Sequence, residues 1–120
     1  MSILIKKYLM AWAVWITGLP GCGKSAIANK VRALLRGKNV PVKVLELDEI
    51  RRVITPQPKY TEEERDIVYS SLAYMAFLLT QANVNIIIDA TANRRRYRAL
   101  ARSLIRNFAE AYVRCDLETC

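Results

Sequence analysis

A run of eight residues combines glycines, a lysine and a hydroxyl at the fixed spacing G-x-x-x-x-G-K-[ST]. The glycines let the backbone curl, so that successive N–H groups point inward and hold phosphate oxygens, and the positive end of a following helix adds to the attraction. Lys24 would reach the β- and γ-phosphates, and the hydroxyl of Ser25 would bind Mg²⁺. A chance glycine-rich turn is the alternative. We therefore predict an ATP and Mg²⁺ site on Gly18, Gly21, Cys22, Gly23, Lys24 and Ser25.

Two aspartates lie near the ends of apolar segments that are typical of buried strands. Asp89 follows Ile86-Ile87-Ile88, as in a Walker B segment, and Asp48 ends the segment 42–47. Ligands of open α/β sheets bind at the carboxyl ends of strands, so both carboxylates should lie at the same edge as Lys24. One would serve Mg²⁺ and the other would accept a proton from an acceptor hydroxyl, and the sequence leaves open which does which. The alternative for Asp89 is a cap on the segment that follows it.

Arginines provide candidate anion-binding groups. Arg51 and Arg65 are candidates for the substrate, because guanidinium groups bind phosphate or sulfate bidentately, and ion pairs with neighbouring glutamates are the alternative. Arg94 lies just beyond a strand end. Four further arginines, at 95, 98, 102 and 106, should point away from the apolar side of their helix, most of them into solvent, and no aromatic residues are interleaved with them for stacking on bases. We therefore expect no nucleic-acid binding.

The elements that must position these residues alternate along the chain. The patterns predict strands over 13–17, 42–47, 86–88 and 111–114, and helices over 24–36, 61–81 and 94–107. Thr61 and Glu64 form a capping box for the second helix. The predicted inner faces are Ile27, Val31, Leu34 and Leu35; Val68, Leu72, Met75 and Leu79; and Tyr97, Leu100, Ala101, Leu104 and Phe108.

Strands that are apolar throughout and alternate with helices predict a mostly parallel sheet covered on both faces. We therefore expect a three-layer α/β/α fold of the P-loop class with about four strands. Residues 1–12 would form an N-terminal extension and residues 13–120 the P-loop domain.

Composition narrows the class of protein. The chain has 120 residues, 52% of them hydrophobic, and a formal net charge of +8, which suits anionic partners but equally a solvated arginine-rich surface. Three cysteines without metal-ligand spacing, together with the absence of histidine, indicate free thiols in the reducing cytoplasm. No uninterrupted apolar stretch reaches the roughly 20 residues of a membrane span.

The ordered motifs resemble those of the adenylyl-sulfate kinase family. That family shows a GLSGSGKS-type loop, then LDGDxxR, FSxxDRxxN, an ISPYR-like segment and FxExYVxxPLExC. This chain has GLPGCGKS at 18–25, LELDEIR at 45–51, YTEEER at 60–65, ATANR at 90–94 and FAEAYVRCDLETC at 108–120. Family members continue with a lid and an adenine-contacting segment, so we expect the domain to be incomplete at its C-terminus.

The resemblance implies transfer of the γ-phosphate of ATP to the 3′-hydroxyl of adenylyl sulfate, in sulfate assimilation. Asp48 would match the carboxylate beside the acceptor hydroxyl and the metal. Arg51 and Arg65 would match arginines that hold adenylyl sulfate, Tyr60 the aromatic before the substrate-contacting helix, and Thr91 and Arg94 the lining of the substrate pocket. The expected partner is a small anionic nucleotide, with a homodimer as the candidate assembly.

Two alternatives stay open. Val68 replaces the asparagine of the family motif, and Asp89-Ala90-Thr91 matches the D-x-T of polynucleotide-kinase-like proteins. A kinase of the same fold that acts on a polynucleotide end or a small metabolite is therefore one alternative. A nucleotide-binding protein without catalysis is the other, because without a lid water is not excluded from the site.

Overall fold

The computed structural model describes residues 11–18, 23–92 and 94–114. Eight elements follow one another in the described part of the chain: β1 (Ala13–Gly18), α2 (Lys24–Gly37), β2 (Val42–Glu46), α3 (Leu47–Ile54), α4 (Glu62–Gln81), β3 (Asn85–Asp89), α5 (Arg95–Leu104) and β4 (Phe108–Val113).

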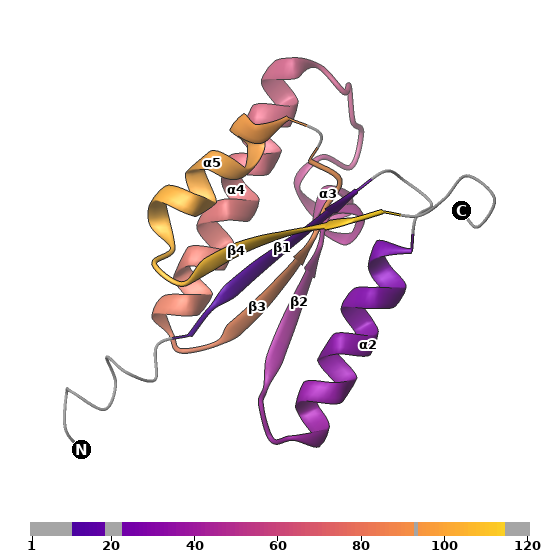
Figure 1. The fold of residues 1–120 in the computed structure, drawn as a ribbon. Coiled ribbons are helices and arrows are strands. Elements are labelled where there is room, and N and C mark those ends of the chain that lie inside the picture. The colour runs from indigo at the N-terminus through magenta and orange to yellow at the C-terminus, as the bar shows by residue number, and fades with distance from the viewer. Residues whose placement is uncertain (1–10, 19–22, 93, 115–120) are drawn as a thin grey trace.

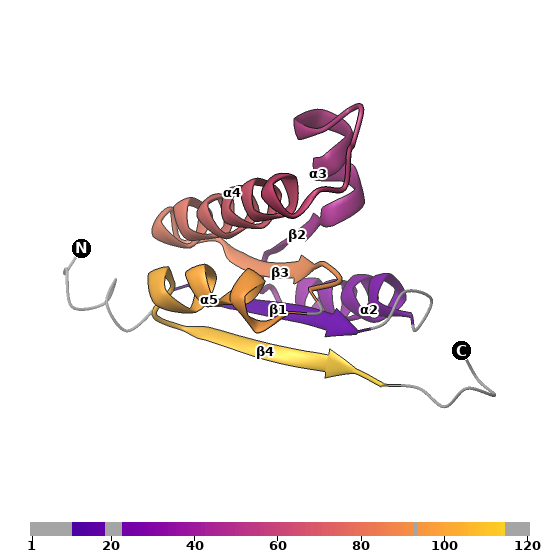
Figure 2. The ribbon, with the colours of Figure 1, turned by 90° about the horizontal axis from the view of Figure 1, so that it is seen from above.

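The four strands form one sheet in the order β2-β3-β1-β4, and every neighbouring pair is parallel. Helices α4 and α5 cover one face of this sheet and α2 covers the other (Figure 1). Seen from above, α4 lies beside β3, whereas α5 lies beside β4 (Figure 2). The predicted three-layer α/β/α fold with a parallel sheet of about four strands is confirmed.

The alternation of side chains in the central strands builds the two halves of the core. On β3, Ile86 and Ile88 belong to the cluster under α4 and α5, while Ile87 packs with Ala28 on the α2 side. All three isoleucines are at most 1% exposed. Trp15 is fully buried in the first cluster, where its indole N–H donates to the carbonyl of Ala90 over 3.1 Å. The centre of the sheet is therefore fixed from both sides, just below the strand ends that carry the site.

Helix α4 begins as its sequence predicts. The Oγ1 of Thr61 accepts a hydrogen bond of 3.1 Å from the backbone N–H of Glu64. The reciprocal half of the capping box does not form, because the Glu64 carboxylate accepts from the backbone N–H of Lys59 at 2.8 Å instead. Glu64 thus ties the loop before α4 to the first turn of the helix.

Several boundaries and faces differ from the prediction. The strand β2 ends at Glu46, and Phe108 begins β4 instead of completing a helix, since α5 stops at Leu104.

On α2, Ile27 and Leu34 are 41% and 60% exposed, because this single helix contacts its face of the sheet through a narrow stripe around Ala28. On α4, the predicted Val68 and Leu72 are fully buried, whereas Met75 and Leu79 are only partly so.

Within the described residues, no helix is both long enough and apolar enough to cross a membrane. The division into residues 1–12 and 13–120 stays a prediction, because residues 1–10 and 115–120 lie outside the described part.

Candidate active site

The two described ends of the glycine motif have the backbone that the motif requires. Gly18 ends β1 with φ 153°, and a Cβ built on it would lie 2.7 Å from the backbone oxygen of Val113. Gly23 adopts a left-handed conformation (φ 83°, ψ 22°) and directly precedes α2, whose first residues are Lys24 and Ser25. Backbone N–H groups in a first helical turn lack helical partners and attract anions. The predicted Gly21 and Cys22 lie outside the described residues.

Ser25 and Asp89 are in direct contact. Asp89 is the last residue of β3 and only 4% exposed, and its Oδ2 accepts a hydrogen bond of 2.6 Å from the Oγ of Ser25. A hydroxyl and a carboxylate are the hard oxygen donors that Mg²⁺ prefers, and in phosphate-bound sites Mg²⁺ takes few protein ligands because phosphate oxygens and water supply the rest. The described residues contain no group of three His, Cys, Asp or Glu side chains that could hold a metal ion.

The sequence predicted that Asp48 ends a strand, and this prediction is wrong. The chain leaves β2 at Glu46 in an extended conformation and enters α3 at Leu47, so Asp48 lies in the first turn of that helix. Acidic residues favour a first helical turn because of the positive end of the helix dipole, which explains why the helix begins so early. Asp48 is exposed and still lines the same cavity as Lys24 and Ser25.

One cavity of about 630 Å³ gathers half of the predicted site residues. It opens at the carboxyl ends of the strands, between the start of α2 and the starts of α3, α4 and α5. Its lining includes six of the predicted site residues: Lys24, Ser25, Asp48, Arg65, Thr91 and Arg94. The groups predicted for the phosphate side and those predicted for the acceptor side therefore face one space.

The sequence reasoning missed that aromatic rings line this cavity: it gave Tyr69 no role, and it placed Tyr97 in the core, where Tyr97 is indeed buried, without assigning it to the site. The rings of Tyr69 and Tyr97 stack with centroids 4.3 Å apart and planes 14° from parallel, and both line the cavity. The hydroxyl of Tyr69 donates to the carbonyl of Thr91. Burial raises the pKa of Tyr69, against the opposing influence of Arg51, so the ring keeps its proton as a hydrogen-bond donor.

Arg51, a predicted substrate ligand, lies behind the cavity and is not part of its lining. Its side chain is 13% exposed and pairs with Glu64 at 3.4 Å, which is the alternative that the sequence left open. Its guanidinium also lies 5.5 Å from the ring centroid of Tyr60. Tyr60 has φ 56°, which is rare for a bulky side chain and needs support from its surroundings. The guanidinium of Arg51, held in place by its ion pair with Glu64, contacts the ring of Tyr60 and stabilises this conformation. Tyr60 thereby lines the cavity.

Arg94 lines the cavity while forming an ion pair with Glu62 of α4, at 2.6 Å. Glu62 also pairs with Arg96 at 2.6 Å. These side chains are about half exposed, so the pairs are screened by solvent and individually weak. Arg94 can therefore exchange Glu62 for an incoming anion at small cost.

Three of the four arginines expected on the solvent side, Arg95, Arg102 and Arg106, are exposed, so the prediction that most of them are solvated is confirmed. Arg98 is the exception. Arg98 is 17% exposed, pairs with Glu110 of β4, and donates to the carbonyl of Ala92. Glu110 also pairs with Arg102. Burial opposes the ionisation of Glu110, but the hydrogen bonds from Arg102 and Arg98 outweigh it and lower its pKa. The helical period placed Arg98 on the outer side, yet the edge strand β4 comes close enough to pair with it.

Glu46 is a further carboxylate at this edge for which the sequence reasoning proposed no function. It is the register partner of Asp89 on the neighbouring strand, so the two side chains emerge on the same face of the sheet. Burial, and then the nearby carboxylates of Glu49, Asp89 and Asp48, raise the pKa of Glu46. The sequence already carried a signal for a role of Glu46, because this carboxylate stands at the end of an apolar strand.

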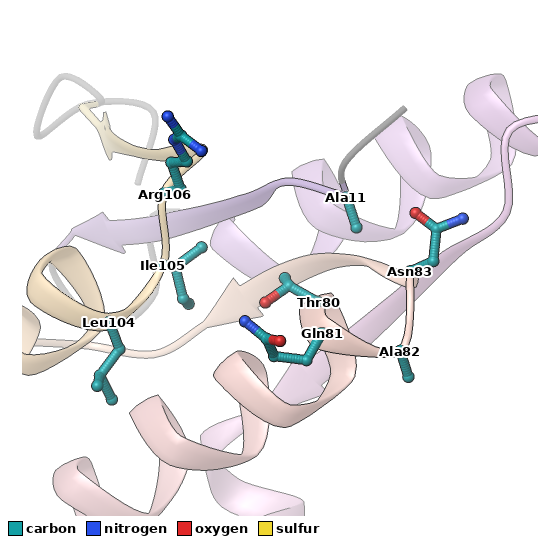
Figure 3. A pocket seen from close by; sticks show the side chains of 8 residues that line it. All are labelled: Ala11, Thr80, Gln81, Ala82, Asn83, Leu104, Ile105 and Arg106. Carbon is teal, nitrogen blue, oxygen red and sulfur yellow. The ribbon is translucent and has the colours of Figure 1, made fainter. Parts of the chain in front are cut away.

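Another cavity, of about 510 Å³, lies at the opposite end of the sheet (Figure 3). It is lined by Ala11, Leu104, Ile105, Arg106 and the residues from Thr80 to Asn83, and it includes none of the predicted site residues. The chemistry that the motifs predict therefore belongs to the cavity at the carboxyl ends of the strands.

Comparison with known proteins agrees with this arrangement. The family model of adenylylsulphate kinase matches residues 10–120. The adenylyl-sulfate kinase of Halothermothrix orenii is 36% identical over 107 residues, which are 89% of this chain and 58% of that protein. The probable adenylyl-sulfate kinase of Archaeoglobus fulgidus is 34% identical over 109 residues, 91% of this chain and 70% of that protein.

Among solved structures, the Mycobacterium tuberculosis APS kinase CysC in complex with AMPPNP and APS superposes with a TM-score of 0.83. It is 28% identical, and the match covers 92% of this chain and 63% of that one. This chain thus spans somewhat more than half the length of several relatives that it matches. The order of its motifs, the parallel sheet and these matches together show that the chain belongs to the adenylylsulphate kinase family.

Proposed function

We propose that this protein transfers the γ-phosphate of ATP to the 3′-hydroxyl of adenylyl sulfate. The observation that carries the proposal is the single cavity onto which Lys24 and Ser25 open from the nucleotide side, and Arg65, Thr91 and Arg94 from the other side. The M. tuberculosis relative was solved with a nucleotide and APS together, and this supports two adjacent ligands here.

On the nucleotide side, Lys24 and the backbone N–H groups at the start of α2 would hold the phosphates and neutralise the charge that develops during transfer. Ser25 and Asp89 would hold Mg²⁺, which when bound supplies charge neutralisation on the phosphate oxygens. Asp89 is almost fully buried, and its hydrogen bond with Ser25 keeps these two oxygen donors together in the absence of a ligand.

On the acceptor side, Arg65 and Arg94 would bind the anionic phosphosulfate group, while Tyr60 would contact the nucleoside. Asp48 would accept the proton of the 3′-hydroxyl as its oxygen attacks the γ-phosphorus. The new O–P bond forms as the bond to the β-phosphate oxygen breaks, ADP leaves, and the proton passes from Asp48 to water.

The proposal is tested by measuring ADP release and product formation with adenylyl sulfate, with a 5′-hydroxyl oligonucleotide, and with no acceptor. We expect ADP release that depends on adenylyl sulfate and yields one equivalent of 3′-phosphorylated product. Transfer to the oligonucleotide alone would support the polynucleotide alternative. Tight ATP binding without ADP release under any condition would favour a nucleotide-binding protein without catalysis and would contradict the proposal.

A further inference from the structure

Two tyrosines in the lining of the cavity connect the helices that carry the acceptor-side arginines. Helices α4 and α5 lie side by side on one face of the sheet (Figure 1). Arg65 and Tyr69 belong to α4, whereas Arg94 is the N-cap residue of α5 and Tyr97 lies in the first turn of that helix. All four residues line the cavity. The spacing of the two arginines therefore depends on how the helices are held together close to the site.

Each arginine is tied to the tyrosine of its own helix. Arg65 and Tyr69 are four residues apart in a helix, so their side chains leave it on the same side. At the start of α5, the backbone N–H of Tyr97 donates a hydrogen bond of 3.1 Å to the carbonyl of Arg94. A change in the position of either ring is therefore transmitted to the backbone that carries the neighbouring arginine.

The two tyrosine rings form a buried contact between the helices. They stack with centroids 4.3 Å apart, and Tyr69 and Tyr97 are only 6% and 5% exposed. On its other side, Tyr69 stacks on Trp15 of β1 with centroids 6.2 Å apart, and its hydroxyl donates to the carbonyl of Thr91. Stacked aromatic pairs are favourable beyond the area that they bury. The stack is thus fixed to the sheet as well as to both helices.

Ion pairs at the rim of the cavity hold the two helices less firmly. Glu62 of α4 pairs with Arg94 and Arg96, and Asp66 pairs with Arg96 at 3.2 Å. These side chains are 48% to 57% exposed, so solvent and salt weaken the pairs. An incoming anion can replace Glu62 at Arg94, whereas it cannot replace one of the stacked rings. The stack is therefore the contact that still fixes the arginines when an acceptor is bound.

We propose that Tyr69 and Tyr97 are positioning residues whose stack sets the spacing of Arg65 and Arg94, and that this spacing makes the site selective for an acceptor with two adjacent anionic groups. The inference rests on the proposed function, in which these arginines bind the phosphosulfate group. Guanidinium groups bind oxyanions with a defined geometry, so two of them at a fixed spacing favour two neighbouring anionic groups. AMP, an adenine nucleotide with a single phosphate, offers only one such group and should bind less tightly.

Calorimetric titration of the full chain with adenylyl sulfate and with AMP measures this selectivity as the ratio of the two dissociation constants. For the wild type we expect adenylyl sulfate to bind at least about 10-fold more tightly than AMP, because one more hydrogen-bonded contact between charged groups is made. Tyr97→Met fills the space without a ring and should reduce the ratio by about 10-fold, mainly through weaker binding of adenylyl sulfate. Tyr97→Phe keeps the ring and should retain most of the ratio.

The matched control is Tyr74→Met. Tyr74 also makes an aromatic contact in α4, with the ring of Phe77 at 5.9 Å between centroids, but it is 53% exposed and lies outside the cavity lining. Circular dichroism and the affinity for ATP should be unchanged in these variants, because Lys24 and Ser25 lie on the other side of the cavity. If Tyr97→Met does not fold, Tyr69→Phe serves in its place, since it removes only the hydroxyl that holds the ring to Thr91 and should lower the ratio in the same direction.

The outcomes separate this inference from the proposed function. A wild type that does not bind adenylyl sulfate would contradict the proposed function and, with it, the inference. A wild type that binds adenylyl sulfate no more tightly than AMP would overturn the inference alone. An unchanged ratio in folded Tyr97→Met, or an equal loss in Tyr74→Met, would overturn it as well.

Discussion

The Oγ of Ser25, in the first turn of α2, donates a 2.6 Å hydrogen bond to the Oδ2 of Asp89, at the end of β3. This contact joins the start of α2 to one of the two central strands of the sheet. It also brings together two oxygen donors of the kind that Mg²⁺ prefers, and one of them, Ser25, lines the cavity.

Replacing Asp89 by asparagine should weaken the contribution of Mg²⁺ to ATP binding while leaving the fold intact, since the amide is nearly the same size as the carboxylate. We expect the Mg²⁺-dependent gain in ATP affinity to fall by about 10–100-fold. Calorimetric titration of ATP with and without Mg²⁺ measures this gain. An unchanged gain would show that Asp89 only orients Ser25 or caps the strand end.

Replacing Asp48 by asparagine should lower kcat by about 10²–10⁴-fold with little change in KM, because Asp48 is proposed to take a proton only as the reaction proceeds. Steady-state kinetics with adenylyl sulfate checks this expectation. Glu49→Gln is the matched control, since Glu49 is an exposed acidic residue of the same helical turn but does not line the cavity. Equal losses in the two variants would contradict a specific role for Asp48.

Replacing Arg65 or Arg94 by alanine should raise KM for adenylyl sulfate by about 10–100-fold, as expected when a hydrogen bond to a charged group is lost. The affinity for ATP should change little, because both arginines lie on the acceptor side of the cavity. Arg95→Ala serves as the control, since Arg95 is exposed and outside the cavity lining. A selective loss of ATP affinity in either variant would place that arginine on the nucleotide side instead.

The stability of the protein should depend on the ionisation of Glu110. Its pKa is lower in the folded protein than in the unfolded chain, so its contribution is fully present above the ordinary glutamate value of about 4.3. That contribution is lost as the pH falls through the lower folded value. We expect the difference in Tm between the wild type and Glu110→Gln to shrink steadily below about pH 4.3. Thermal unfolding followed by circular dichroism measures it, and a constant difference would contradict this linkage.

Gly18→Ala should destabilise the fold by about 1–3 kcal/mol, because the added methyl would meet the backbone oxygen of Val113 at 2.7 Å. Gly37→Ala is the contrasting variant, since nothing lies within 4 Å of a Cβ at that position. There the free energy of unfolding should stay the same or rise by up to about 1 kcal/mol. Urea denaturation compares the two, and equal effects would contradict the close contact at Gly18.

The sequence by itself determined the class of fold, and it predicted which residues form the phosphate side of the site. Continuous apolar strands such as the one before Asp89 can only be buried on both faces, and glycine, lysine and serine at the P-loop spacing serve a local backbone geometry. Both features depend on residues that are neighbours along the chain, so periodicity and spacing were enough to predict them.

Only the tertiary structure decided which arginines line the cavity and which form ion pairs, because these contacts depend on long-range packing. Which arginines reach the cavity depends on how α4 and α5 meet, and this left Arg65 and Arg94 in its lining but turned Arg51 toward Glu64. Arg98, which the helical period had assigned to solvent, forms an ion pair with Glu110 of the edge strand β4. These outcomes follow from contacts between residues far apart in sequence, whose energies no local pattern encodes.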